Sequence, residues 1–185
     1  MATLSELQGL FSIKENSRSF MDEDFDRLHT FLYTLFCVNE KDREYTKFPE
    51  MLWEFLSIFL MAGNFLRIDV SAAFRAKYRK VCPRCRLRPC ECWDEAIKPL
   101  FRPYPGPLPK ERSLTQIQRM LNWVFPSRQS LMEEVCHLHS EIEELRQAFL
   151  CQDVAGMKEE VADIFAWFMR VTNTLGISLD EQGPL

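Results

Sequence analysis

Apolar residues recur at helical spacing along most of the chain. Between residues 156 and 175 they form one stripe, in which neighbouring members are mostly three or four residues apart: Val161, Ile164, Phe165, Phe168 and Val171. Such a stripe is typical of a helix that packs on other helices. Similar patterns predict long helices over 22–38, 48–66 and 129–150, and short helices that begin behind the caps Thr3 and Ser113. The pattern therefore predicts an all-α fold.

The pattern occurs twice along the chain. The sequence from Thr3 matches that from Ser113, and the same offset pairs the stretch from Leu28 with the stretch from Leu138. With one residue lost, the match continues between the segments that begin at Asn64 and Asn173. A series of matches at nearly one spacing indicates a tandem duplication. We expect the two copies to pack about a pseudo-two-fold axis into one helical bundle.

The two copies span residues 1–78 and 113–185, and 79–112 connects them. The connector holds seven of the 10 prolines and nine basic against four acidic side chains. The first copy has 12 acidic and nine basic residues, and the second has 11 and five. The formal charge of -4 is therefore a sum of opposite regional charges. No polybasic domain is present, so nucleic-acid binding is not expected.

Composition narrows the class of protein further. Hydrophobic residues make up 46% and charged residues 27% of the 185 positions, which fits neither a disordered chain nor a membrane protein. Seven cysteines without a secretory signal indicate a reduced, cytoplasmic protein. We expect Cys37, Cys136 and Cys151 to be buried in helices as apolar side chains.

The other four cysteines lie within eleven residues of the connector: Cys82, Cys85, Cys90 and Cys92. Four closely spaced thiolates suit a structural zinc site, and the neighbouring Arg84, Arg86 and Arg88 favour thiolate over thiol. The spacing is tighter than in most zinc fingers, so a disulfide pair or redox switch is an alternative. An iron-sulfur cluster is a third choice.

Paired carboxylates characterise the second copy. Glu141 and Glu144 are three residues apart in one predicted helix, and Glu160 and Asp163 repeat that spacing in the next. Side chains at this spacing share a helix face, so antiparallel helices would bring all four together. Like charges at close range need neutralising cations, and carboxylate oxygens suit Mg²⁺ or Mn²⁺. The alternative is an ordinary solvated helix face.

A comparison of the copies favours a site in only one of them. Phe31 and Thr34 stand at the positions of Glu141 and Glu144. Met51 replaces Glu160, while Glu54 matches Asp163. We interpret the second copy as carrying the site and the first as scaffold, although drift of exposed residues gives the same contrast.

Three segments of the second copy resemble the MazG-type all-α nucleoside triphosphate pyrophosphohydrolases: 140–145, 159–164 and 173–179. The resemblance covers residues 113–181, and the first copy matches only weakly, through Asn64 to Val70. It implies a four-helix core in which Glu141, Glu144, Glu160 and Asp163 hold Mg²⁺ (or Mn²⁺) and act in catalysis, with Asn173 near metal and phosphates. The implied reaction is hydrolysis of a (deoxy)nucleoside triphosphate to monophosphate and pyrophosphate, which removes unwanted nucleotides from the pool.

The resemblance also implies that a dimer completes the site, so the chain is expected to be a monomeric pseudo-dimer or a homodimer of tandem chains. In the pseudo-dimer, the base of the nucleotide would pack against Phe31, Trp53 or Phe55. The alternative is that these three aromatic residues belong to the hydrophobic core. Lys158 and Arg170 are candidate phosphate ligands, or surface cations beside acidic helices. Ser178 replaces the family's usual Asp, and the second copy is shorter than the first at its end. These departures leave a competing function: a weak or inactive MazG-like protein that contacts a partner through its connector, using Arg84, Arg86, Arg88 and Arg102.

Overall fold

A computed structural model describes residues 3–11, 19–37, 48–92, 110, 112–126 and 129–179, without the side chains of 19–22 and 35–37. Its regular elements are α-helices, which confirms the all-α prediction: α1 (Leu4–Leu10), α2 (Ser19–Cys37), α3 (Phe48–Phe65), α4 (Val70–Lys77), α5 (Leu114–Val124), α6 (Leu131–Leu150) and α7 (Val154–Thr174). The boundaries expected from the sequence lie close to these. The prolines at 99–109 and Arg102 lie outside the described residues.

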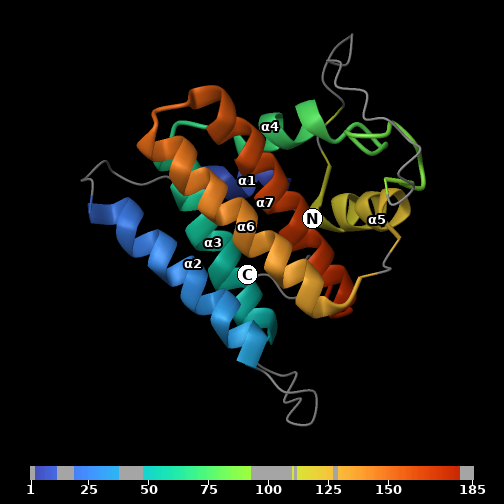
Figure 1. Ribbon diagram of the computed structural model, residues 1–185, viewed down its shortest axis with the longest axis horizontal. Helices are drawn as coiled ribbons and strands as arrows, with labels where there is room; N and C mark the ends of the chain where they lie inside the picture. The colour runs from blue at the N-terminus through green and yellow to red at the C-terminus, as the bar shows by residue number, and fades with distance from the viewer. Residues whose placement is uncertain are drawn as a thin grey trace.

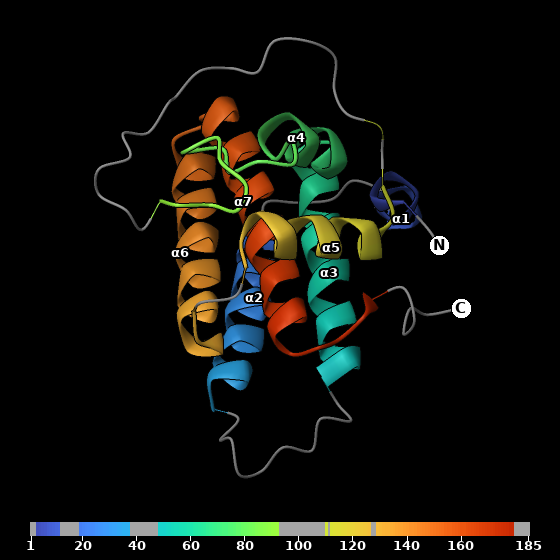
Figure 2. The same cartoon turned by 90° about the vertical axis from the view of Figure 1, so that its right-hand side faces the viewer.

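The four long helices α2, α3, α6 and α7 lie side by side, and the shorter α1, α4 and α5 flank them (Figures 1 and 2). Helices α6 and α7 form a hairpin through a short turn, and α2 packs against both α3 and α6. Helix α4 packs on α7. The last contact places the end of the first half of the chain beside the helix that carries Glu160 and Asp163.

Local sequence sets the helix starts. Thr3, Ser113 and Ser130 each accept a hydrogen bond from a backbone amide three residues on, and each cap is completed by a returning Glu or Gln side chain. Such reciprocal caps satisfy amides that the helix leaves free. Thr3 and Ser113 also form an isolated antiparallel bridge with each other, so the starts of α1 and α5 meet.

One hydrophobic core joins the two halves of the chain. Phe55 of α3 stacks on Phe168 of α7 with ring centroids 4.9 Å apart, and Phe59 stacks on Phe165 at 6.4 Å. The edge of Phe74 in α4 meets Phe165 at 5.1 Å. Fully buried aromatic rings carry much of the hydrophobic stabilisation of a domain. The two halves therefore depend on each other for burial.

A buried glutamine holds the segment that follows the third helix in each half. Gln8 donates to the carbonyl of Ile68 at 2.7 Å and accepts from the amide of Val70 at 3.0 Å. Gln118 makes the corresponding bonds to Ile177 and Leu179, at 2.8 Å and 3.5 Å. The partners in the second set stand at the positions that the sequence match pairs with those in the first.

The turn after each third helix is also built twice. Asn64 donates to the carbonyl of Gln8 and Asn173 to that of Gln118, at 2.9 Å and 3.0 Å. Three residues after each asparagine the backbone has positive φ, 56° at Arg67 and 70° at Gly176. Glycine suits this conformation best, so the first turn tolerates some backbone strain.

Some expectations about exposure are wrong. Cys136 and Cys151 are exposed rather than buried, because both lie on the outer side of the α6–α7 hairpin or in its turn. The side chain of Cys37 lies outside the described residues. Among the described helices, none is by itself long and apolar enough to cross a membrane; α3 and α4 pass that test only as a pair bent by 96°.

Two acidic side chains at matching positions are buried with different surroundings. Glu134, 1% exposed, accepts hydrogen bonds from Arg170 at 3.0 Å and Thr174 at 2.6 Å. Asp24, 3% exposed, has an Oδ2 atom without a hydrogen-bond partner in the described part of the chain. Burial raises the pKa of Asp24 from 3.8 to about 6, although Arg27 opposes the shift. A charged Asp24 therefore opposes folding at neutral pH.

We expect Asp24→Asn to raise the free energy of unfolding by about 1–2 kcal/mol at pH 7.5, with a smaller gain at pH 4.5. Because the pKa of Asp24 is higher in the folded state, protonation stabilises the fold below pH 3.8, and that stability is lost as pH rises through 6. Urea unfolding at both pH values measures the difference. Glu134→Gln is the control and should destabilise at pH 7.5; an Asp24→Asn variant without any pH-dependent gain contradicts the assignment.

Candidate functional site

The α6–α7 hairpin brings three of the four predicted carboxylates together. Glu141 and Glu144 lie on α6 and Glu160 on α7, and one carboxylate oxygen of each lies within 4.8 Å of the others. Asp153 caps α7 by accepting hydrogen bonds from the amides of Ala155 and Gly156. The short turn and the cap hold the two helices in the register that makes the cluster. One hard cation can bridge oxygens at this spacing.

Burial and repulsion shift the pKa values within this carboxylate cluster. Burial, with the charge of Asp163 and contact with Glu160, raises the pKa of Glu141 to about 8. The pKa of Glu160 is also raised, chiefly by burial. Glu141 therefore carries a proton at neutral pH when no cation is bound. Glu144 is exposed, so the cluster is open to solvent on its side.

Asp163 lies beside the cluster but is held by two residues from the first half. It accepts a hydrogen bond from the hydroxyl of Tyr78 at 2.7 Å and forms an ion pair with Lys77 at 2.5 Å. Burial, followed by the charge of Asp163, raises the pKa of Tyr78 well above its ordinary value, so Tyr78 remains a donor. Both oxygens of Asp163 thus have partners from the end of α4.

A tryptophan completes the contacts of the cluster. The indole N–H of Trp167 donates to Glu141 at 3.2 Å. Neither Trp167 nor the Lys77–Tyr78 pair is apparent from the carboxylate motifs. Trp167 lies four residues after Asp163 and so on the same helix face, which is a signal that the sequence offered. Lys77 and Tyr78 are far from Asp163 along the chain, so their contacts with it have no local signature.

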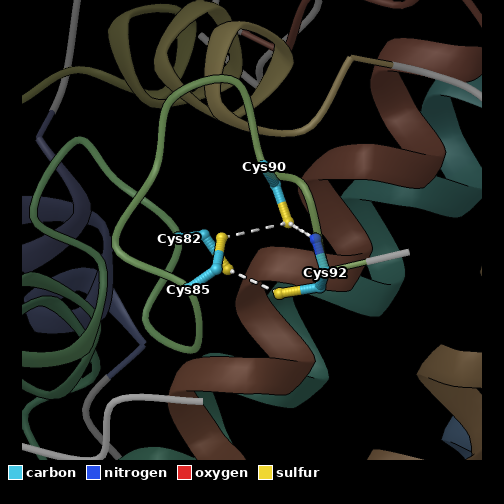
Figure 3. A group of neighbouring side chains, drawn as sticks. All are labelled: Cys82, Cys85, Cys90 and Cys92. Atoms are coloured by element: carbon cyan, nitrogen blue, oxygen red, sulfur yellow. Dashed lines mark hydrogen bonds between the residues drawn. The ribbon is translucent and has the colours of Figure 1, made fainter. Parts of the chain in front are cut away.

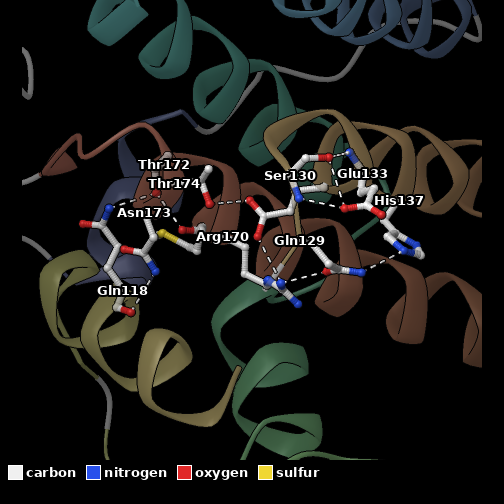
Figure 4. A network of polar contacts seen from close by, with 11 residues as sticks. Gln118, Gln129, Ser130, Glu133, His137, Arg170, Thr172, Asn173 and Thr174 are labelled. Atoms are coloured by element: carbon white, nitrogen blue, oxygen red, sulfur yellow. Dashed lines mark hydrogen bonds and ion pairs between the residues drawn. The ribbon is translucent and has the colours of Figure 1, made fainter. Parts of the chain in front are cut away.

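The three residues predicted to bind phosphate do not belong to the cluster of Glu141, Glu144 and Glu160. Lys158 is exposed near the start of α7. Arg170 donates to Gln129 at 2.8 Å (Figure 4). It also donates to buried Glu134 at 3.0 Å. Asn173 lies ten residues beyond Asp163, where it braces α5, so it is about 15 Å along the helix from that carboxylate.

The three aromatic residues considered as walls for a base belong to the core instead. Phe55 is fully buried, and Phe31 and Trp53 are 8% and 9% exposed. Phe31 packs on Phe55 at a centroid distance of 4.8 Å, and Phe55 in turn packs on Phe168. Their burial therefore favours the alternative that these three side chains belong to the hydrophobic core.

The four cysteines of the connector form a compact group (Figure 3). All four sulfur atoms lie within 4.8 Å of one another, with Cys82 and Cys92 3.5 Å apart and Cys85 and Cys90 3.9 Å apart. Sulfurs bound to one tetrahedral Zn²⁺ at the usual bond length are roughly 3.8 Å apart. None of the four cysteines forms a disulfide, and their arrangement is compatible with structural zinc.

The backbone of this cysteine loop, residues 82–92, is anchored independently of any metal. The amide of Cys82 donates to the carbonyl of Leu87, and that of Cys90 donates to Val124 at the end of α5. Burial raises the pKa of Cys82 well above its usual range. Burial acts the same way on Cys85, but backbone hydrogen bonds outweigh it and lower the pKa to about 7. The Cys85 thiol therefore ionises at lower pH than the thiols of Cys82 and Cys92, whose pKa values burial raises.

Comparisons of the chain with protein-family models, curated proteins and solved structures give no match.

We expect the chain purified without chelator to contain one zinc ion, and Cys85→Ser to lose most of it, because three thiols leave a tetrahedral site incomplete. Elemental analysis measures the metal, and thermal unfolding should show a lower Tm for the variant. Cys136→Ser, an exposed cysteine outside the cluster, is the matched control. Disulfides among the four cysteines in the freshly purified protein would contradict the zinc site.

Proposed function

We propose that the chain is a MazG-like, Mg²⁺-dependent hydrolase that converts a (deoxy)nucleoside triphosphate to monophosphate and pyrophosphate. The observation that carries the proposal is the convergence of Glu141, Glu144 and Glu160 from two adjacent helices. Three carboxylates this close, two of them partly buried, are costly without a cation. Glu-x-x-Glu and Glu-x-x-Asp pairs on adjacent helices are also the motifs that resemble the family.

The residues divide into ligands and positioning groups under this proposal. Bound Mg²⁺ would neutralise charge on the triphosphate and lower the pKa of a coordinated water. Glu141 and Glu160 would hold the cation, and Glu141 would lose its proton when it does so. Exposed Glu144 would orient the attacking water as a base. Lys77 and Tyr78 fix Asp163 beside the cluster.

We also propose that the two halves are diverged copies related by an internal two-fold axis. The glutamine and asparagine contacts that recur at matching positions of the two halves support this proposal. Equivalent residues also meet each other, as in an isologous dimer: Thr3 bridges Ser113, and the rings of His29 and His139 lie 4.7 Å apart. The single chain would then supply both subunits of a family dimer and a single site.

A competing function is nucleotide binding without turnover. The ion pair between Lys77 and Asp163 favours it, because that pair already neutralises one of the four acids expected to hold metal. The two functions differ in whether pyrophosphate is released.

A pyrophosphate-release assay with Mg²⁺ over ribonucleoside and deoxyribonucleoside triphosphates tests hydrolysis. We expect at least one substrate, and a loss of roughly 100-fold or more in kcat in Glu160→Gln, because removal of a metal ligand removes transition-state charge stabilisation. Mg²⁺ or Mn²⁺ should raise the Tm of the wild type and not of this variant.

Glu159→Gln is the matched control, since Glu159 is the exposed neighbour of Glu160 and lies outside the cluster. It should retain the activity and the metal-dependent shift in Tm. Absence of pyrophosphate from every nucleotide, or equal activity of Glu160→Gln and wild type, would overturn the hydrolase.

A further inference from the structure

A cavity of about 570 Å³ lies between the cysteine loop and the helices of the carboxylate cluster. Cys82, Cys90 and Cys92 line one side of it, and His137 of α6 and Trp167 of α7 line the other. In Figure 2 the loop lies across α6 and α7. The cavity volume is within the range of small-molecule sites, roughly 300–1,000 Å³.

Two of the residues that line the cavity donate hydrogen bonds to Glu141 and Asp163. Trp167 donates to Glu141 at 3.2 Å, and Tyr78 donates to Asp163 at 2.7 Å. The cavity and the carboxylate cluster therefore share a wall one side chain thick. The cavity therefore lies directly beside the cluster at which the proposed function puts the phosphates.

The lining is chiefly aromatic, with a few polar groups. The ring of His137 stacks on Trp167 at 4.3 Å with an angle of 10° between the planes, and the guanidinium of Arg170 lies 4.4 Å from the Trp167 ring. Phe125 and Tyr78 face each other edge to face at 6.1 Å. Exposed Arg84 contributes a further cation. Aromatic walls with few polar groups suit a flat heterocycle.

We propose that this cavity binds the nucleoside part of the substrate, and that the cysteine loop is thereby a substrate-binding element as well as a connector. The inference rests on the proposed function for the phosphates and adds the element that recognises the base. It also explains why four metal-compatible thiols stand at this place. A metal held by Cys82, Cys85, Cys90 and Cys92 would add to the backbone hydrogen bonds that anchor the loop, and its loss would loosen the wall that faces Trp167.

The test measures binding of α,β-imido analogues of the nucleoside triphosphates with Mg²⁺, by calorimetry, and of inorganic triphosphate as a probe without a base. Phe125→Leu removes an aromatic wall, and Arg84→Ala removes the exposed cation of the loop. Arg88→Ala is the control: it removes the same charge from the same loop, but its guanidinium lies over Trp123, outside the cavity, at 3.5 Å. Zinc content and Tm establish that each variant is folded.

We expect Phe125→Leu to weaken binding of the preferred analogue about tenfold, in the range of one lost stacking contact. Arg84→Ala should weaken it at least threefold, and neither variant should alter binding of inorganic triphosphate. Arg88→Ala should bind both probes as the wild type does.

The outcomes separate the cavity from the hydrolase. If Phe125→Leu and Arg84→Ala both keep the wild-type affinity and KM while hydrolysis depends on Glu160, the cavity does not bind the nucleoside. The proposed hydrolase function is retained in that case. Analogue binding that depends on Phe125 in a chain without hydrolysis would support the cavity and overturn the hydrolase. If the variants weaken binding of the analogue and of inorganic triphosphate equally, the cavity binds phosphate and the inference is wrong. The inference is also wrong if the wild type binds none of the analogues.

Discussion

Repulsion among carboxylates is the constraint on which the arrangement around α6 and α7 depends. Glu141, Glu144 and Glu160 lie within 4.8 Å of one another, and Asp163 adds its charge to theirs. At partly buried positions such repulsion is screened poorly. Three features offset it: a proton on Glu141, the indole donor of Trp167 and the contacts of Asp163 with the end of α4. Each of them lowers the cost of keeping the carboxylates close together, so the cluster can persist within the bundle.

The offsetting groups tie the site to the whole bundle. Lys77 and Tyr78 belong to the first half of the chain, and they reach Asp163 only because α4 packs on α7. That packing in turn uses the edge contact of Phe74 with Phe165 and the shared aromatic core. A second half folded alone would have the carboxylate motifs without the cation and hydroxyl that hold Asp163. Association of the halves is therefore a condition for the site as well as for the core.

The sequence predicted the helices and the carboxylate cluster because both depend on local spacing. Helical periodicity marks the face of a helix that packs, and caps such as Ser130 mark where a helix begins. The four thiols were apparent for the same reason, since one short segment contains them all. Burial of Asp24 and exposure of Cys136 depend on which helix covers which face, and no local pattern encodes that. Lys77 was missed because its charge does not indicate a partner in a distant segment. The spacing of Trp167 from Asp163 marks a shared helix face, but it does not indicate the partner of Trp167 on the neighbouring helix.

Some residues are alike at matching positions of the two halves and others differ. This comparison separates the residues that the fold requires from those of the carboxylate cluster. Gln8 and Gln118 make the same buried bonds, and a buried amide without partners would be costly in either half. The acid at positions 24 and 134 is present in both halves, but Met61 stands where the second half has Arg170, so Asp24 lacks the ion pair of Glu134. The bundle tolerates this acid at neutral pH although its charge costs stability above its pKa of about 6. Loss of either glutamine would leave buried backbone groups without these bonds, which accounts for the recurrence of the glutamine contacts in both halves while the carboxylates differ.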